Sequence, residues 1–142
     1  MTVQLSAVVC VMAILGMTCG LHAQDTTKSI WDGVYSSAQA DRGKELFLDN
    51  CAKCHQNTLE GMDVIPPLKG SHFMSDWASQ SVAELVSRVH TTMPMDDPGK
   101  LSTKSATDVV AYLLQQNDSP AGKTELPADP GIQGQILIDM AK

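Results

Sequence analysis

The feature that most constrains this chain is a pentapeptide with two cysteines and a histidine. It reads Cys51-Ala52-Lys53-Cys54-His55. This C-x-x-C-H pattern is typical of a covalent haem attachment site. The two thiols can each add across one vinyl group of a haem, and their spacing places both sulfurs on one side of a helical turn. His55 then lies where its imidazole can bind the iron as an axial ligand.

Two other interpretations of the cysteine pair are weaker. A redox dithiol needs the βαβ context of a thioredoxin-like fold, and the sequence shows no such pattern. A zinc site needs a second pair of ligands, whereas Cys10 and Cys19 lie in an apolar leader. We therefore expect one haem c, bound through Cys51 and Cys54.

The beginning of the chain has the pattern of a secretory leader. Residues 5–17 form an uncharged apolar run, and small residues follow up to Ala23. This pattern predicts a signal peptide over 1–23 and a periplasmic location. No Lys or Arg precedes the run, so an upstream start or an uncleaved anchor is the alternative. The run is shorter than a membrane span, so we expect no membrane insertion after cleavage.

The chain is acidic, with a formal net charge of −6. The predicted leader contains no Asp, Glu, Lys or Arg, so the mature chain keeps this charge. An acidic surface does not attract nucleic acid or anionic membranes. We expect a monomer that forms transient complexes with redox proteins presenting a basic docking patch. The same acidity also serves solubility, so it does not by itself identify a partner.

The 142 residues are too few for more than one ordinary domain. We predict an all-α domain over 36–117, between an N-terminal arm (24–35) and a C-terminal extension (118–142). Trp31 and Tyr35 are expected to anchor the arm to the core. The extension carries enough apolar residues to pack on the domain.

Three main helices are predicted from their caps and apolar stripes. The first begins with a capping box formed by Ser36 and Gln39, and the second begins at Ser81. The third begins at Ser102 or Thr103. A long loop that wraps the haem is expected between the first two helices. The predicted ranges are 36–50, 81–91 and 102–116 for the helices, and 56–77 for the loop.

The second axial ligand has to come from elsewhere in the chain. Met93 is the preferred candidate, because it lies far along the chain and Pro94 fixes the backbone beside it. A methionine thioether opposite a histidine is the usual ligand pair of small electron carriers. Met95 is the runner-up. The remaining candidates are Met62 and Met74 as thioethers and His72 and His90 as imidazoles.

Groups around the haem ligands can be predicted as well. A ligating histidine usually donates its second ring N–H to a carbonyl or carboxylate. The carbonyl of Pro66 is well placed to accept from His55, unless Pro66 and Pro67 merely form a stiff turn. The indole N–H of Trp77 needs a partner when buried, and a haem propionate is a suitable one.

These motifs together resemble those of class I cytochromes c over residues 36–117. Residues 66–70, Pro-Pro-Leu-Lys-Gly, are similar to the Pro-x-Leu-x-Gly loop of the family. The resemblance implies that Pro66 accepts a hydrogen bond from the proximal histidine, and that Met93 with Pro94 supplies the distal ligand. It further implies that Leu68, Leu85, Val89 and Leu113 line the haem, and that Gly43 and Phe47 cross Val109 and Tyr112.

A weaker similarity connects the Trp-Asp-Gly-Val-Tyr string at 31–35 with bacterial periplasmic mono-haem cytochromes that serve quinoprotein dehydrogenases. The function implied is a one-electron carrier between a dehydrogenase or quinol-oxidising complex and a terminal acceptor. No catalytic residues are expected. The alternatives are a dedicated cytochrome subunit of a periplasmic dehydrogenase, or a haem sensor or peroxidase-like protein with an open iron position.

Overall fold

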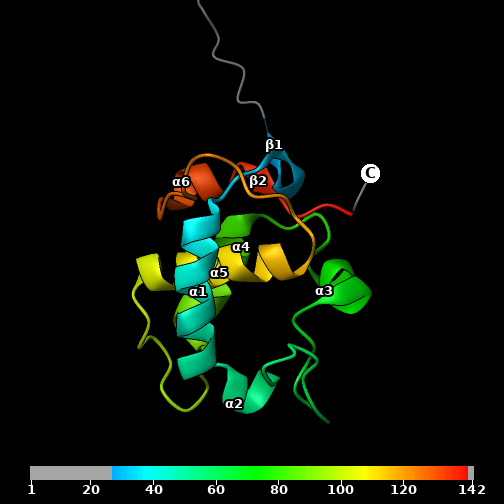
Figure 1. Cartoon of the computed structure of the whole chain (residues 1–142), viewed down its shortest axis with the longest axis vertical. Coiled ribbons are helices and arrows are strands. Elements are labelled where there is room, and N and C mark those ends of the chain that lie inside the picture. The colour runs from blue at the N-terminus through cyan, green and yellow to red at the C-terminus, as the bar shows by residue number, and fades with distance from the viewer. Residues whose placement is uncertain (1–26, 141–142) are drawn as a thin grey trace, which may run out of the picture.

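The computed structural model describes residues 27–140, so the predicted signal peptide lies outside the described part. The fold is all-α, and its three longest helices are α1 (Ser37–Asn50), α4 (Val82–Thr92) and α5 (Thr103–Gln116), as predicted (Figure 1). Among the described residues, no helix is long and apolar enough to cross a membrane. The shorter elements are β1 (Lys28–Ser29), η1 (Ile30–Asp32), α2 (Ala52–His55), α3 (Gly70–Trp77), α6 (Pro130–Gln133) and β2 (Ile136–Leu137).

The core forms where α1 crosses α5, and Gly43 makes this crossing possible. A Cβ atom at Gly43 would lie 1.8 Å from the carbonyl oxygen of Asp108, so only a hydrogen fits there. One turn further on, the rings of Phe47 and Tyr112 pack with their centroids 5.4 Å apart. The predicted crossing is therefore present, although the backbone of Asp108 rather than Val109 faces Gly43.

The helix starts follow the predicted caps, with one exception. Ser81 and Glu84 form a complete capping box at α4, and Ser102 rather than Thr103 caps α5. At α1 the hydroxyl of Ser36 accepts from the backbone N–H of Gln39, 3.2 Å away. The side chain of Gln39 does not return the bond, because it is buried and bonds to other elements. The prediction of a capping box at α1 was therefore half wrong.

The predicted loop over 56–77 was also wrong in its last third, which forms α3. Phe73 and Met74 on this helix are buried in the core, and Trp77 is half-buried against it. The helix follows Lys69 without a side-chain cap, so the sequence offered no start signal of the usual kind. Its apolar contacts to the core stabilise a helix that local signals do not predict.

The N-terminal arm and the C-terminal extension pack together as one layer, which we call the arm–tail layer (residues 28–35 and 118–140). Its strands β1 and β2 pair in parallel. The indole N–H of Trp31 donates to the carbonyl of Asp139 at 3.1 Å, and the hydroxyl of Tyr35 donates to the carbonyl of Ser119. Figure 1 shows β1, β2 and α6 at the opposite end of the molecule from α2.

Candidate functional site

The two cysteines and the histidine lie on one short helical turn. Cys51 ends α1 and begins α2, and its carbonyl accepts from the backbone N–H groups of Cys54 at 3.1 Å and His55 at 2.9 Å. This turn brings the two thiols to neighbouring positions on one face. Both are free thiols, with Cys51 half-buried and Cys54 exposed. The geometry therefore leaves both sulfurs available to a haem.

His55 is buried, and its Nδ1 lies 3.0 Å from the carbonyl oxygen of Pro66. A carbonyl can only accept, so Nδ1 carries the proton and the lone pair of Nε2 remains for a metal. Burial lowers the pKa of His55 below its usual value, although the bond to Pro66 opposes this. The ring is thus held in the neutral form and in the tautomer that an iron ligand requires.

Gly61 allows the loop after α2 to fold back so that Pro66 reaches His55. Its backbone has φ of +65°, and a Cβ there would lie 2.2 Å from the carbonyl oxygen of Ile65. The N–H of Gly61 donates to the carbonyl of His55 at 3.2 Å. Sequence reasoning recognised Gly61 only as a loop residue, because the close approach that requires glycine is visible only in three dimensions.

Asn117 holds the end of the same loop against α5. Its side-chain amide donates to the carbonyl of Leu68 at 3.0 Å, and its side-chain oxygen accepts from the N–H of Gly70 at 2.8 Å. Asn117 is buried directly after α5. The sequence analysis missed this role, because an asparagine after a helix is ordinary and its partners lie far away in the chain.

The loop after α4 carries Met93 and approaches α2 from the other side. Met93 directly follows α4 and is half-buried, whereas the side chain of Met95 is 73% exposed. Lys53 of α2 forms an ion pair with Asp96 of this loop at 3.5 Å. Figure 1 accordingly shows α2 between the loop that precedes α3 and the loop that follows α4.

The predicted apolar neighbours of the haem belong to the core. Leu85, Val89 and Leu113 are buried, and Leu68 is half-buried against the same cluster. The ring centroid of Trp77 lies 6.4 Å from that of Phe73. Together these residues form an apolar environment contributed by α3, α4, α5 and the loop before α3.

The chemistry of the cysteines does not favour the two rival interpretations. Burial, with a smaller effect from Cys54, raises the pKa of the Cys51 thiol to about 11. A redox dithiol needs a lowered thiol pKa, because the thiolate is the nucleophile. Within residues 27–140, no three His, Cys, Asp or Glu side chains lie together as a metal site would require. A haem attachment site remains the interpretation that fits.

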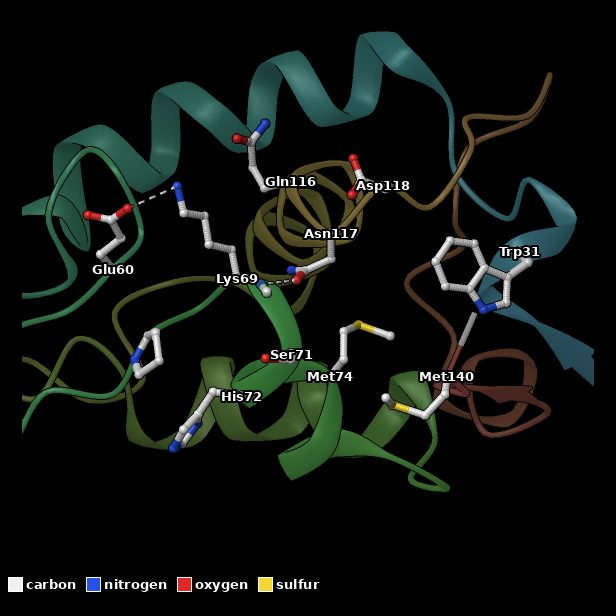
Figure 2. Close-up of a pocket in the computed structure, with 12 residues that line it drawn as sticks. Trp31, Glu60, Lys69, Ser71, His72, Met74, Gln116, Asn117, Asp118 and Met140 are labelled. Carbon is white, nitrogen blue, oxygen red and sulfur yellow. Dashed lines mark hydrogen bonds and ion pairs between the residues drawn. The ribbon is translucent and has the colours of Figure 1, made fainter. Parts of the chain in front are cut away.

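A separate groove of about 770 Å³ lies between α3, the end of α5 and the arm–tail layer. Figure 2 shows Trp31 and Met140 from that layer on one side and Lys69 paired with Glu60 on the other. His72, a minor candidate for the iron, lines this groove and pairs with Asp76 at 3.0 Å. The groove contains none of the preferred haem ligands.

Comparison with known proteins identifies the family. Residues 38–113 match the family model described as cytochrome c oxidase, cbb3-type, subunit III. The chain belongs to this family of class I c-type cytochromes. It is also 31% identical over 83 residues to cytochrome c6 of a Synechocystis species. The aligned residues cover 56% of this chain and 68% of that protein.

Two further likenesses involve larger proteins. Thiosulfate dehydrogenase of Psychrobacter arcticus is 31% identical over 80 residues, which is 51% of this chain but only 24% of the enzyme. The crystal structure of the sulfane dehydrogenase SoxCD from Paracoccus pantotrophus matches with a TM-score of 0.50 and 22% identity, over 75% of this chain and 61% of that one. The latter likeness supports the fold alone.

Family membership implies a covalently bound haem c and a role in electron transfer. The residues present fit this cofactor. The two free thiols lie on one turn, and the neutral imidazole of His55 keeps Nε2 unprotonated. The sequence therefore predicted the cofactor class and the fold correctly.

Proposed function

We propose that this chain is a periplasmic one-electron carrier with a single haem c. Cys51 and Cys54 would bind the haem covalently, and His55 and Met93 would be the axial ligands. The bound haem supplies an iron that alternates between the ferric and ferrous states. The observation that carries this proposal is the hydrogen bond from His55 to Pro66 beside two free thiols. We expect no catalytic residues.

On the proximal side, the Pro66 carbonyl fixes the ring plane of His55 and makes its Nε2 more basic. A persistent ligand geometry favours electron transfer, because little rearrangement accompanies a change in iron charge. The lowered pKa of His55 supports the same role, because the neutral ring is the form that binds iron.

On the distal side, the assignment of Met93 rests on position and burial. The 3.5 Å distance between Lys53 and Asp96 shows that the loop lies beside α2. Asp96 is three residues after Met93, so Met93 is within about 11 Å of it along the chain. Met93 is half-buried, whereas Met95 is 73% exposed. A thioether ligand raises the reduction potential relative to a second histidine.

The surrounding residues would exclude water from the iron. Leu68, Leu85, Val89 and Leu113 provide apolar surface, and we propose that Trp77 donates its indole N–H to a haem propionate. A low-polarity environment limits solvent rearrangement during electron transfer and tunes the potential. These roles complete the predicted site without adding a group that could act on a bound substrate.

Optical spectroscopy of the purified protein tests the ligand assignment. A closed site shows a weak long-wavelength sulfur-to-iron band when oxidised and no spectral shift when CO is added to the reduced protein. Met93→Ala should abolish the band, allow CO to bind and lower the potential, while Met95→Ala should change none of these. CO binding by the unmodified reduced protein would instead favour a sensor or a peroxidase-like function.

The likeness to thiosulfate dehydrogenase favours a second candidate function. In this case the chain is a dedicated cytochrome subunit of a periplasmic dehydrogenase, rather than a carrier that serves several partners. A stable stoichiometric complex with one dehydrogenase during gel filtration of native extracts would support it. A monomer whose reduction rate falls with added salt would favour the free carrier, because its net charge of −6 points to docking on a basic patch.

A further inference from the structure

Two histidines of this protein make the same kind of bond, one beside each loop of the site. Nδ1 of His55 lies 3.0 Å from the carbonyl oxygen of Pro66, and Nδ1 of His90 lies 2.7 Å from that of Leu101. Each bond closes a segment whose ends are 11 residues apart. The first bond belongs to the proximal side described above. The second spans the loop that carries Met93.

His90 is well placed to fix this loop. It lies on the last turn of α4, three residues before Met93, and is half-buried. Leu101 is only 5% exposed and directly precedes Ser102, the cap of α5. Because the Leu101 carbonyl can only accept, Nδ1 of His90 is the donor. The bond therefore joins the end of one helix to the beginning of the next.

The other contacts of this loop are local or exposed. The N–H of Met93 donates to the carbonyl of Val89 at 3.2 Å, which only continues α4. The N–H of Asp97 donates to Pro94 at 3.0 Å within the loop itself. In the ion pair of Lys53 with Asp96 the two side chains are 84% and 70% exposed, so it contributes little. The bond from His90 fixes the far end of the loop to a buried backbone.

We propose that His90 is a positioning residue for Met93, acting by fixing the end of the loop between α4 and α5 to the Leu101 carbonyl. This inference rests on the proposed ligation of the iron by His55 and Met93. With the end of the loop fixed, fewer positions would be open to the Met93 thioether. When the bond is absent, the ten residues from 91 to 100 gain freedom, and Met93 leaves the iron more often.

The test compares two substitutions of His90 in the haem-loaded protein. His90→Ala removes the donor and is compatible with a helix. His90→Asn keeps an amide nitrogen near the place of Nδ1 and should restore the bond. The readouts are the intensity of the sulfur-to-iron band, the affinity of the reduced protein for CO, and amide exchange over residues 91–101.

We expect His90→Ala to raise the apparent CO affinity and the exchange rates of the loop about fivefold, the effect of losing one ordinary hydrogen bond. His90→Asn should lie close to the unmodified protein. His72→Ala is the matched control, because His72 is exposed on α3 and forms its ion pair with Asp76 of the same helix. It should leave all three readouts unchanged. If His90→Ala does not accumulate with haem, His90→Gln replaces it. The amide of glutamine lies one bond further from the backbone than that of asparagine, so it is displaced from the place of Nδ1.

The outcomes separate this inference from the proposed function. If the unmodified protein lacks the sulfur-to-iron band and binds CO, the ligation by Met93 is wrong. If the unmodified protein is closed and His90→Ala leaves the band, the CO affinity and the loop exchange unchanged, His90 has no positioning role. Equal losses in His90→Ala and His90→Asn would also overturn the inference, because the hydrogen bond would then not be the cause.

Discussion

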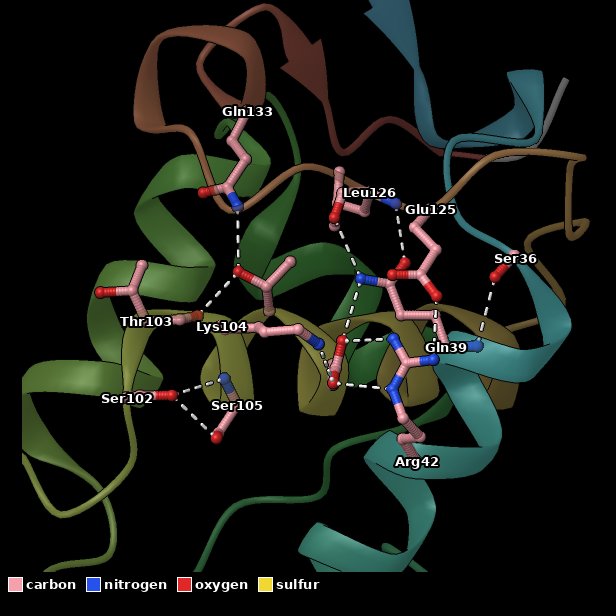
Figure 3. A network of polar contacts seen from close by, with 12 residues as sticks. Ser36, Gln39, Arg42, Ser102, Thr103, Lys104, Ser105, Glu125, Leu126 and Gln133 are labelled. Carbon is pink, nitrogen blue, oxygen red and sulfur yellow. Dashed lines mark hydrogen bonds and ion pairs between the residues drawn. The ribbon is translucent and has the colours of Figure 1, made fainter.

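The two ends of the molecule are stabilised in different ways. Buried side chains join the arm–tail layer to the helices beneath it through partners far away in the chain. The side chain of Gln39 accepts from the N–H of Leu126 at 2.7 Å and donates to its carbonyl at 3.0 Å, and Gln133 donates to Thr107 at 3.1 Å. Figure 3 shows these bonds converging from α1, α5 and the extension. All of these bonds are made within the chain.

At the opposite end, which we call the motif end (residues 51–69 and 91–101), the chain bonds less to itself. Its side-chain contacts to more distant parts of the chain are mainly the two histidine–carbonyl bonds, the bond from Asn117 to the carbonyl of Leu68 and the exposed pair of Lys53 with Asp96. Large apolar residues are exposed at both ends but more strongly here, with Val64 92% and Met95 73% exposed against 49% for Ile132 and 54% for Met140 in the arm–tail layer. From this difference we expect the arm–tail layer to be stable by itself and the motif end to depend on the haem for its apolar interior.

Removing the haem should produce the largest effect and should strike the two ends unequally. The double variant Cys51→Ala and Cys54→Ala cannot attach haem covalently, so haem staining of a denaturing gel should be negative. The motif end loses an apolar group much larger than a leucine side chain. We therefore expect its stability to fall by at least about 4 kcal/mol.

Amide exchange followed by mass spectrometry measures this directly. Protection should be lost first over 51–69 and 91–101, while the amides of the arm–tail layer serve as the internal control. Equal loss of protection at both ends would show that the haem supports the whole fold, and the contrast drawn here would be wrong.

The features that could be predicted from the sequence are local ones. The spacing of Cys51, Cys54 and His55 is contained in one turn, and the cap at Ser81 involves residues three positions apart. Local patterns of this kind identify the cofactor and most helix starts, because their chemistry depends on near neighbours. The partner of His55 followed from a loop motif shared with a known family.

The features that sequence reasoning missed depend on distant partners. Gln39 has the pattern of a capping residue, yet its side chain bonds to Asp108 and Leu126, which lie 69 and 87 residues away. The same holds for His90, which the sequence offered only as a minor candidate for the iron. Its bond to Leu101 exists only because α4 and α5 meet beside the loop. Spacing along the chain does not encode such contacts.

A second prediction concerns Asp108 of α5, which bonds to Gln39 beside the arm–tail layer. Burial alone would raise the pKa of Asp108, but hydrogen bonds from Arg42, Gln39 and Lys104 outweigh it and lower the pKa below its usual value. A carboxylate with a lowered folded pKa contributes stability above its unfolded value of about 4. That stability is lost as the pH falls through the lower folded value.

We expect Asp108→Asn to reduce the free energy of unfolding by roughly 2 kcal/mol at pH 7, since charge-assisted hydrogen bonds are lost. The difference from the unmodified protein should shrink as the pH is lowered below about 4, because Asp108 is then protonated in the unfolded chain and, at lower pH still, in the folded protein as well. Urea unfolding at a series of pH values measures this, with the exposed Asp76→Asn as control. A difference that does not depend on pH would mean that packing, and not charge, makes Asp108 important.

The smallest effect is expected for Lys53→Ala, and it sharpens the description of the motif end. The Nζ of Lys53 lies 3.5 Å from the carboxylate of Asp96, but these side chains are 84% and 70% exposed. Water and salt screen such a pair, so its loss should change stability by no more than about 0.5 kcal/mol. The CO affinity of the reduced protein should also stay within about twofold of the unmodified value, well below the effect expected of His90→Ala. If Lys53→Ala instead raises the CO affinity as strongly as His90→Ala, the surface ion pair holds the Met93 loop. The bond from His90 would then not do for the distal loop what the bond from His55 does for the proximal one.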